Sequence, residues 1–252
     1  MYTKEQIINS IKRNQMLYQK DEINYTGKTK PLHKTSTYYS EVISEYLLSR
    51  LDNPKEIQKT LQLWNMDVRK NFQFNNHDGT IEKETNRREE ILCKKLYNLC
   101  KKSDVSLKNL GHIINYQVNL IENTKVNIDL VSTIDQKIYI IEVKGHLDSN
   151  IGISSSETLL RCMLEIESYY RFLLNNQDDF FKTLSSKDYN NLLNRIITPV
   201  IEKAILVSKS TQAWIEYQEI NTPERIKLKA LLDKLMIKVY CIENEISPHS
   251  LD

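Results

Sequence analysis

The sequence predicts an α/β protein, with a mixed central sheet flanked by helices and a helical extension at the N-terminus. Between residues 113 and 144, three short runs rich in β-branched residues are separated by polar turns, which is typical of a three-stranded meander. On either side of the meander, apolar residues recur at the three- and four-residue spacing of amphipathic helices. The 252 residues are also enough to bury a substantial core.

Composition excludes several classes of protein. A hydrophobic content of 40% and a net charge of +2 argue against disorder. No apolar run approaches the roughly 20 residues of a membrane helix, and the N-terminus lacks the apolar segment of a signal peptide. The four cysteines contain no Cys-x-x-Cys pair, so neither a zinc site nor a disulfide scaffold is indicated. We therefore expect a reduced, cytoplasmic protein that does not associate with membranes.

The first part of the chain has the pattern of a helical extension. Expected helices cover residues 4–18, 37–51 and 54–72. Their apolar faces can pack within the chain or on a second subunit, so a homodimer or larger assembly is compatible with them. The polar run 73–80 marks a boundary, which divides the chain into an extension, 1–79, and a second domain, 80–252.

The second domain alternates helices and strands. The pattern predicts a helix, three strands, a helix, a strand, two helices and a final strand, in that order, at residues 82–101, 113–121, 126–134, 138–144, 156–174, 201–207, 210–219, 223–235 and 236–242.

The strand 138–144 carries two charges at its end. Side chains alternate along a strand, so Glu142 and Lys144 share a face with Ile138 and Ile140. Charges at the end of a buried strand require a partner, a metal ion or water. Asp129, near the start of the preceding antiparallel strand, falls at the same end once the turn folds the chain back. The pattern brings two carboxylates and an amine together.

This group of residues suits phosphodiester hydrolysis. Mg²⁺ takes oxygen ligands, and Asp129, Glu142 and the Val143 carbonyl can supply them, with Mn²⁺ as an alternative ion. A bound ion lowers the pKa of its water and stabilises the charge that develops on the phosphate. Lys144 would orient the attacking water or help to deprotonate it.

The spacing of these residues resembles a known signature. Asp129, followed after twelve residues by Glu142-Val143-Lys144, looks like the motif of the PD-(D/E)xK nuclease superfamily, which has the restriction-endonuclease-like fold. The core order of that family, a helix, a three-stranded meander, a helix and a strand, matches residues 82–208. The name-giving proline is replaced by Ile128. The resemblance implies a Mg²⁺-dependent nuclease whose partner is nucleic acid, DNA rather than RNA.

The resemblance implies further site residues on two helices. Members often add an acid on the first helix, and Glu89 is the candidate here, with Glu90 in reserve. Exonuclease-like members carry a Gln-x-x-x-Tyr pattern on the helix after the lysine strand. This chain has the variant Glu165-x-x-x-Tyr169, and Arg161 lies four residues earlier on the same stripe. These three residues are candidates for facing the substrate.

Other interpretations remain open from the sequence. Glu142 and Lys144 also suit a structural ion pair at the rim of a sheet. A catalytically inactive nuclease fold that binds nucleic acid or a protein partner is a second alternative, and a purely structural helical protein is a third. The histidines show no metal-binding spacing, and the chain contains no Walker, Gly-x-Gly-x-x-Gly or Gly-x-Ser-x-Gly motif.

Overall fold

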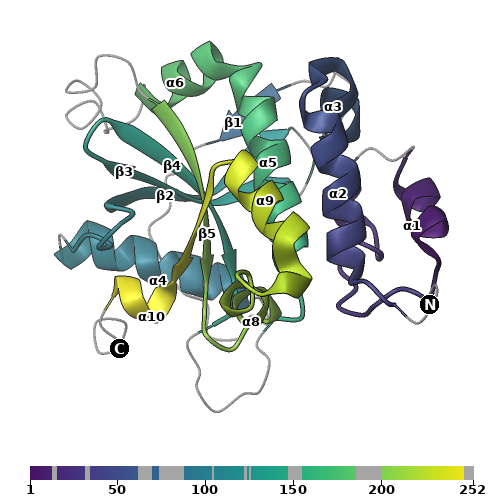
Figure 1. Cartoon of the computed structure of the whole chain (residues 1–252). Coiled ribbons are helices and arrows are strands. Elements are labelled where there is room, and N and C mark those ends of the chain that lie inside the picture. The colour runs from purple at the N-terminus through teal and green to yellow at the C-terminus, as the bar shows by residue number, and fades with distance from the viewer. Residues whose placement is uncertain are drawn as a thin grey trace.

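The structure, a computed structural model, describes residues 1–12, 16–31, 35–61, 70–73, 88–103, 105–121, 124, 126–146, 155–185 and 200–246. Its centre is a sheet of six strands that are neighbours in the order in which they occur in the chain (Figure 1). The strands are β1 (Lys70–Gln73), β2 (His112–Ile121), β3 (Asn127–Ile134), β4 (Lys137–Lys144), β5 (Val200–Val207) and β6 (Ile237–Cys241).

The sheet is mixed, as the sequence predicts. The pairs β1–β2, β2–β3 and β3–β4 are antiparallel. The pairs β4–β5 and β5–β6 are parallel. The expected meander is confirmed as β2–β3–β4, with Leu130 opposite Ile141 in the β3–β4 ladder. On its other side β4 pairs with β5, which places Lys144 opposite Val207. Strand β4 is therefore interior to the sheet.

Helices cover both faces of the sheet. The α-helices are α1 (Lys4–Ile11), α2 (Tyr39–Leu51), α3 (Pro54–Leu61), α4 (Arg88–Ser103), α5 (Leu159–Leu174), α6 (Gln177–Ser185), α8 (Gln212–Gln218), α9 (Ile226–Lys234) and α10 (Ile242–Glu245), and the 3₁₀-helices are η1 (Leu17–Gln19) and η2 (Pro223–Arg225). Helices α4 and α5 lie on opposite sides of the sheet (Figure 1).

The alternation of β4 decides which residues reach which face. Ile138 and Ile140 belong to the core beneath α5, whereas Ile141 and Val143 belong to the core beneath α4. Because side chains two apart share a face, this division confirms the predicted alternation and directs the end of β4 toward α5.

The N-terminal extension is not wholly helical, and the predicted helix 54–72 is wrong at its end. Helix α3 is described over Pro54–Leu61, and residues 70–73 form the strand β1, which pairs with the edge of β2. A strand of four residues is too short to show an alternating pattern in the sequence, and its backbone hydrogen bonds are made to β2. Trp64 and Val68, on which the helical pattern relied, lie outside the described residues. So do the polar run 74–80 and the predicted boundary after residue 79.

The extension shares the core of the sheet. Ile7, Ile11 and Leu17 are fully buried in the cluster that also contains the α5 side chains. The carboxylate of Glu41 on α2 accepts the Lys227 and Leu228 N–H groups at 2.9 and 2.8 Å, so α2 caps the start of α9. Figure 1 shows these two helices side by side.

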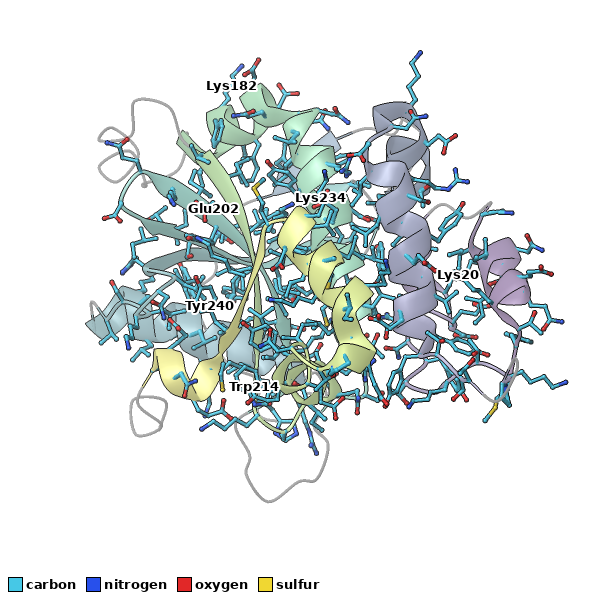
Figure 2. The ribbon with its side chains drawn as sticks, viewed as in Figure 1. Lys20, Lys182, Glu202, Trp214, Lys234 and Tyr240 are labelled. Atoms are coloured by element: carbon cyan, nitrogen blue, oxygen red, sulfur yellow. The ribbon has the colours of Figure 1, made fainter. Side chains whose placement is uncertain are left out.

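The predicted helix 4–18 is also shorter than expected, since α1 ends at Ile11 and a 3₁₀ turn covers 17–19. Exposed lysines such as Lys182 and Lys234 lie at the outer surface (Figure 2). Within the described ranges, no helix combines the length and the apolar character that a membrane span requires.

Candidate functional site

Lys144, at the end of β4, lies among four glutamates. Its Nζ atom is 2.6 Å from Glu142 Oε1 and 2.8 Å from Glu157 Oε2. It is 3.7 Å from Glu165 Oε2 and 3.8 Å from Glu89 Oε2. We call these five residues the Lys144 cluster. The Lys144 and Glu142 side chains are 8% and 3% exposed, so the pair is buried. The structure thus brings together the predicted Glu142, Lys144 and Glu89, and adds Glu157.

Asp129 adjoins this cluster because β3 separates from β4. The register would place Asp129 opposite Glu142, but the ladder ends at Leu130 and Ile141. Instead, Asp129 Oδ2 accepts the Val143 N–H at 2.9 Å, and Oδ1 accepts the Gln117 Nε2 amide at 2.8 Å. The carboxylate therefore lies at the end of β4, as the sequence predicts, and both of its oxygens are oriented by donors.

The local backbone explains how Asp129 reaches this position. Ile128 packs in the core beneath α5 and Leu130 in the core beneath α4, although residues two apart on a regular strand share a face. The alternation therefore breaks at Asp129. On β2, Gln117 has a positive φ of 49° and presents the amide that binds Asp129. A positive φ is costly for a residue other than glycine and is concentrated at functional sites.

Helix α5 delivers a row of side chains spaced four residues apart. Thr158 caps the helix by accepting the Arg161 N–H. Arg161 Nε is 2.9 Å from Glu157 Oε1, and the Tyr169 hydroxyl donates to Glu165 Oε1 at 2.9 Å. Glu165 and Tyr169 are buried, and Arg161 is partly exposed. The row therefore lines the Lys144 cluster, and its contact with substrate stays a prediction.

Glu89 lies in the first turn of α4 and reaches the cluster from the other face of the sheet. Its Oε1 accepts the Gly145 N–H at 3.3 Å, and its side chain is 40% exposed. Glu90, the reserve candidate, pairs along the helix with Lys94 at 3.0 Å. These contacts place Glu89, rather than Glu90, at the site.

The cluster carries more negative charge than positive. Burial, with a smaller contribution from nearby carboxylates, raises the pKa of Asp129 to about 7. Burial and the charge of Glu165 raise the pKa of Glu142 well above its ordinary value. Burial alone would lower the pKa of Lys144, but the surrounding carboxylates outweigh burial and raise that pKa. Lys144 thus stays protonated while the acids compete for too little positive charge.

The negatively charged carboxylate oxygens at this end of the sheet are the type of ligand that hard divalent cations prefer. Glu165 Oε2 is buried and accepts no hydrogen bond from any described residue. Across the described ranges, no three His, Cys, Asp or Glu side chains surround a common metal position. The ligand set that the sequence predicts contains two carboxylates, Asp129 and Glu142, and the Val143 carbonyl, and metal binding by this set stays a prediction.

The sheet carries a second buried ionic group, built around Lys203 on β5. Its Nζ atom is 2.5 Å from Glu167 Oε2 on α5 and 4.3 Å from the centre of the Tyr170 ring. Arg171 Nε binds the other Glu167 oxygen at 2.7 Å. We call Lys203, Glu167, Arg171 and Tyr170 the Lys203 group. Here two cations share one carboxylate.

Sequence reasoning assigned no role to three residues at or beside the site. The four-residue spacing places Glu157 on the stripe of Arg161 and Glu165, but the spacing does not predict its contact with Lys144. Gln117 gives no signal in the sequence, because its role depends on the break in β3. Tyr18 belongs to the extension and reaches Tyr169 across 151 positions of sequence, so no local pattern could connect the two.

Comparison of the chain with models of protein families, with curated proteins and with solved structures finds no match.

Proposed function

We propose that this chain is a metal-dependent nuclease that hydrolyses phosphodiester bonds with Mg²⁺ or Mn²⁺. The observation that carries the proposal is the meeting of Asp129, Glu142 and Lys144 at one end of the sheet. Its strand order, a meander followed by a helix and a parallel strand, also agrees with the PD-(D/E)xK resemblance. The preference for DNA over RNA rests on that resemblance alone.

The carboxylates of Asp129 and Glu142, with the Val143 carbonyl, would hold the ion. When bound, the ion supplies an activated water and positive charge beside the phosphate. The Val143 N–H and the Gln117 amide fix the orientation of Asp129, so this ligand is preorganised. Such preorganisation lowers the cost of binding both the ion and the phosphate.

Lys144 would act as a donor in this site. The surrounding glutamates keep its ammonium protonated, so it orients the attacking water and stabilises negative charge on the phosphate. Glu157 and Glu165 hold the ammonium from the α5 side. Glu89, which is partly exposed, would be an auxiliary acid at the entrance.

The test is a cleavage assay on plasmid, linear duplex DNA, single-stranded DNA and RNA, with Mg²⁺, Mn²⁺ or EDTA. We expect metal-dependent cleavage by the wild type. Removing a preorganised charge from such a site costs on the order of 10²–10³-fold, so Asp129→Asn and Lys144→Met should each lose at least that much activity. The matched control is Lys203→Met, which removes a buried lysine from the neighbouring strand and should retain activity within about threefold.

Failure of the folded wild type to cut any of these substrates with either metal would contradict the proposal. Duplex DNA binding that survives in Asp129→Asn would then favour the inactive binding module, because such a module has no need of that carboxylate.

A further inference from the structure

Two consecutive residues at the start of α4 bind the turn that follows β4. Gly145 has a positive φ of 101°, a conformation that glycine adopts at little cost, and its N–H donates to Glu89 Oε1 at 3.3 Å. Nη1 of Arg88 lies 3.3 Å from Nε2 of His146. The first turn of α4 is therefore bonded to the chain directly after Lys144, and the Arg88 side chain lies beside the end of that strand.

The contact between Arg88 and His146 has only one possible direction. A guanidinium has N–H donors and no acceptor, so His146 Nε2 must accept, and the ring proton is on Nδ1. His146 is 8% exposed, whereas Arg88 is an exposed residue. A buried acceptor thus fixes one end of the Arg88 guanidinium, and the rest of this planar group faces solvent.

Arg88 differs from the other cations of the site in having no carboxylate partner among the described residues. Lys144 is bound by glutamates, and Arg161 is 2.9 Å from Glu157. The positive charge of Arg88 is therefore uncompensated, although carboxylates are in excess nearby. A phosphate that approaches this acidic site needs such a cation, and a guanidinium can bind it through two parallel N–H groups.

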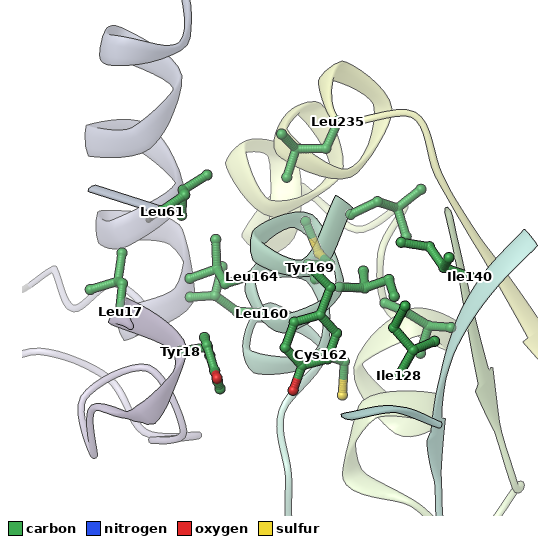
Figure 3. Close-up of a cluster of buried hydrophobic side chains, with 14 of the residues drawn as sticks. Leu17, Tyr18, Leu61, Ile128, Ile140, Leu160, Cys162, Leu164, Tyr169 and Leu235 are labelled. Carbon is green, nitrogen blue, oxygen red and sulfur yellow. The ribbon is translucent and has the colours of Figure 1, made fainter. Parts of the chain in front are cut away.

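The Lys144 cluster is covered on its α5 side and more exposed beside α4. Tyr18 and Tyr169 are 2% and 3% exposed, and Figure 3 shows Tyr18 of the extension next to Tyr169 of α5. In contrast, the side chain of Glu89 is 40% exposed, and Arg88 precedes it on α4. A substrate that reaches Lys144 past the start of α4 therefore passes Arg88.

We propose that Arg88 is a substrate-binding residue, which contacts a phosphate of nucleic acid beside the Lys144 cluster, and that His146 is the positioning residue that directs Arg88. This inference deepens the proposed nuclease function and rests on it for the identity of the partner. The contact is made to phosphate alone, so it requires neither a particular base sequence nor the metal ion. Binding and cleavage can therefore be measured separately.

The first experiment measures the salt dependence of binding to a fluorescein-labelled DNA duplex, by fluorescence anisotropy in EDTA. Each phosphate contact contributes about 0.9 to the slope of log K against log salt concentration. We therefore expect Arg88→Met to lower the magnitude of this slope by about 0.9 and to weaken binding about five- to tenfold at about 0.1 M salt. Arg88→Lys should keep the slope, because it keeps the charge, and should lose part of the affinity with the planar fork.

The matched control is Lys94→Met, which removes a cation of the same helix that is paired with Glu90 at 3.0 Å. This variant should keep the slope of the wild type. His146→Leu should weaken binding in the wild type but not in an Arg88→Met background, because His146 acts through Arg88. Circular dichroism confirms that each variant is folded.

An unchanged slope in Arg88→Met, or an equal decrease in Lys94→Met, would overturn the proposal. Failure of the folded wild type to bind the duplex at low salt would overturn it as well.

The second experiment measures cleavage by the same variants. Arg88→Met should raise KM more than it lowers kcat, since the phosphate is held in the ground state and in the transition state alike. If the wild type binds with an Arg88-dependent slope but does not cleave, the nuclease proposal fails and the Arg88 contact stands. If the wild type cleaves and Arg88→Met leaves the slope unchanged, the nuclease proposal stands and the role of Arg88 is refuted.

Discussion

Two buried lysines on neighbouring parallel strands have opposite electrostatic surroundings. Lys144 on β4 and Lys203 on β5 both meet glutamates of α5. In the Lys203 group, one carboxylate, Glu167, lies between two cations. In the Lys144 cluster, one ammonium faces four carboxylates, and Asp129 lies beside them. Strands β4 and β5 and helix α5 therefore hold one ionic group in which cations outnumber carboxylates and one in which carboxylates outnumber cations.

The pKa values of the two lysines shift in opposite directions. Burial lowers the pKa of Lys203, and Glu167 only partly offsets that effect, as is usual for a structural pair. The pKa of Lys144 moves in the opposite direction because acid is in excess. Unbalanced buried carboxylates cost stability, and a fold retains such a cost mainly where a site uses it. The difference supports the proposed catalytic role of the Lys144 cluster and indicates a structural role for the Lys203 group.

The sharpest test of this comparison neutralises one glutamate in each group. Glu167→Gln leaves Lys203 and Arg171 without a buried counter-charge, so we expect the free energy of unfolding to fall by about 2–4 kcal/mol. Glu142→Gln removes a carboxylate whose pKa is raised, so the metal-free protein should gain about 1 kcal/mol. Urea unfolding in EDTA measures both values. Losses of equal size would show that both lysines belong to ordinary structural pairs.

A smaller effect follows from the pKa of Asp129. The pKa of Asp129 is about 7 in the folded chain, whereas the pKa of an aspartate in the unfolded chain is about 4. The folded chain therefore binds the proton more tightly than the unfolded chain. The stabilisation is complete below pH 4 and is lost as pH rises through about 7. Because the side chain is partly exposed, we expect the loss to be on the order of 1–2 kcal/mol.

Asp129→Asn removes this titration. Urea unfolding of the metal-free protein at pH 5, 6, 7 and 8 should give a smaller decrease for the variant than for the wild type. Parallel pH dependences in the two proteins would show that Asp129 has an ordinary pKa.

The sequence predicts the strands of the site because their signal is local. Alternation along residues 138–144 identifies the face that carries Glu142 and Lys144, and the short turn after residue 134 brings back the strand that contains Asp129. The four-residue spacing on α5 likewise predicts that Glu165 and Tyr169 share a stripe. Each of these relations spans only a few residues, so periodicity is sufficient to show it.

The remaining features depend on contacts that periodicity does not encode. Strand β1 has four residues and is defined by the edge of β2. Glu157 shares the four-residue spacing of α5, but its contact with Lys144 depends on how α5 packs against β4. Tyr18 meets Tyr169 only because the extension packs on α5. The excess of acid around Lys144 likewise emerges only when four elements of the fold converge.

The smallest expected effect distinguishes two adjacent tyrosines of α5. Tyr169 serves the Lys144 cluster through its hydroxyl, whereas Tyr170 serves Lys203 through the face of its ring, 4.3 Å away. Tyr170→Leu should therefore lower the free energy of unfolding by about 0.5–1 kcal/mol, and Tyr170→Phe, which keeps the ring, should change it little. Neither should change cleavage. Thermal unfolding in a Lys203→Met background checks the assignment, because without the ammonium the ring has no cation to bind and the Leu and Phe variants should differ less. A Tyr170→Phe loss as large as that of Tyr170→Leu would transfer the role to the hydroxyl and make the two tyrosines equivalent.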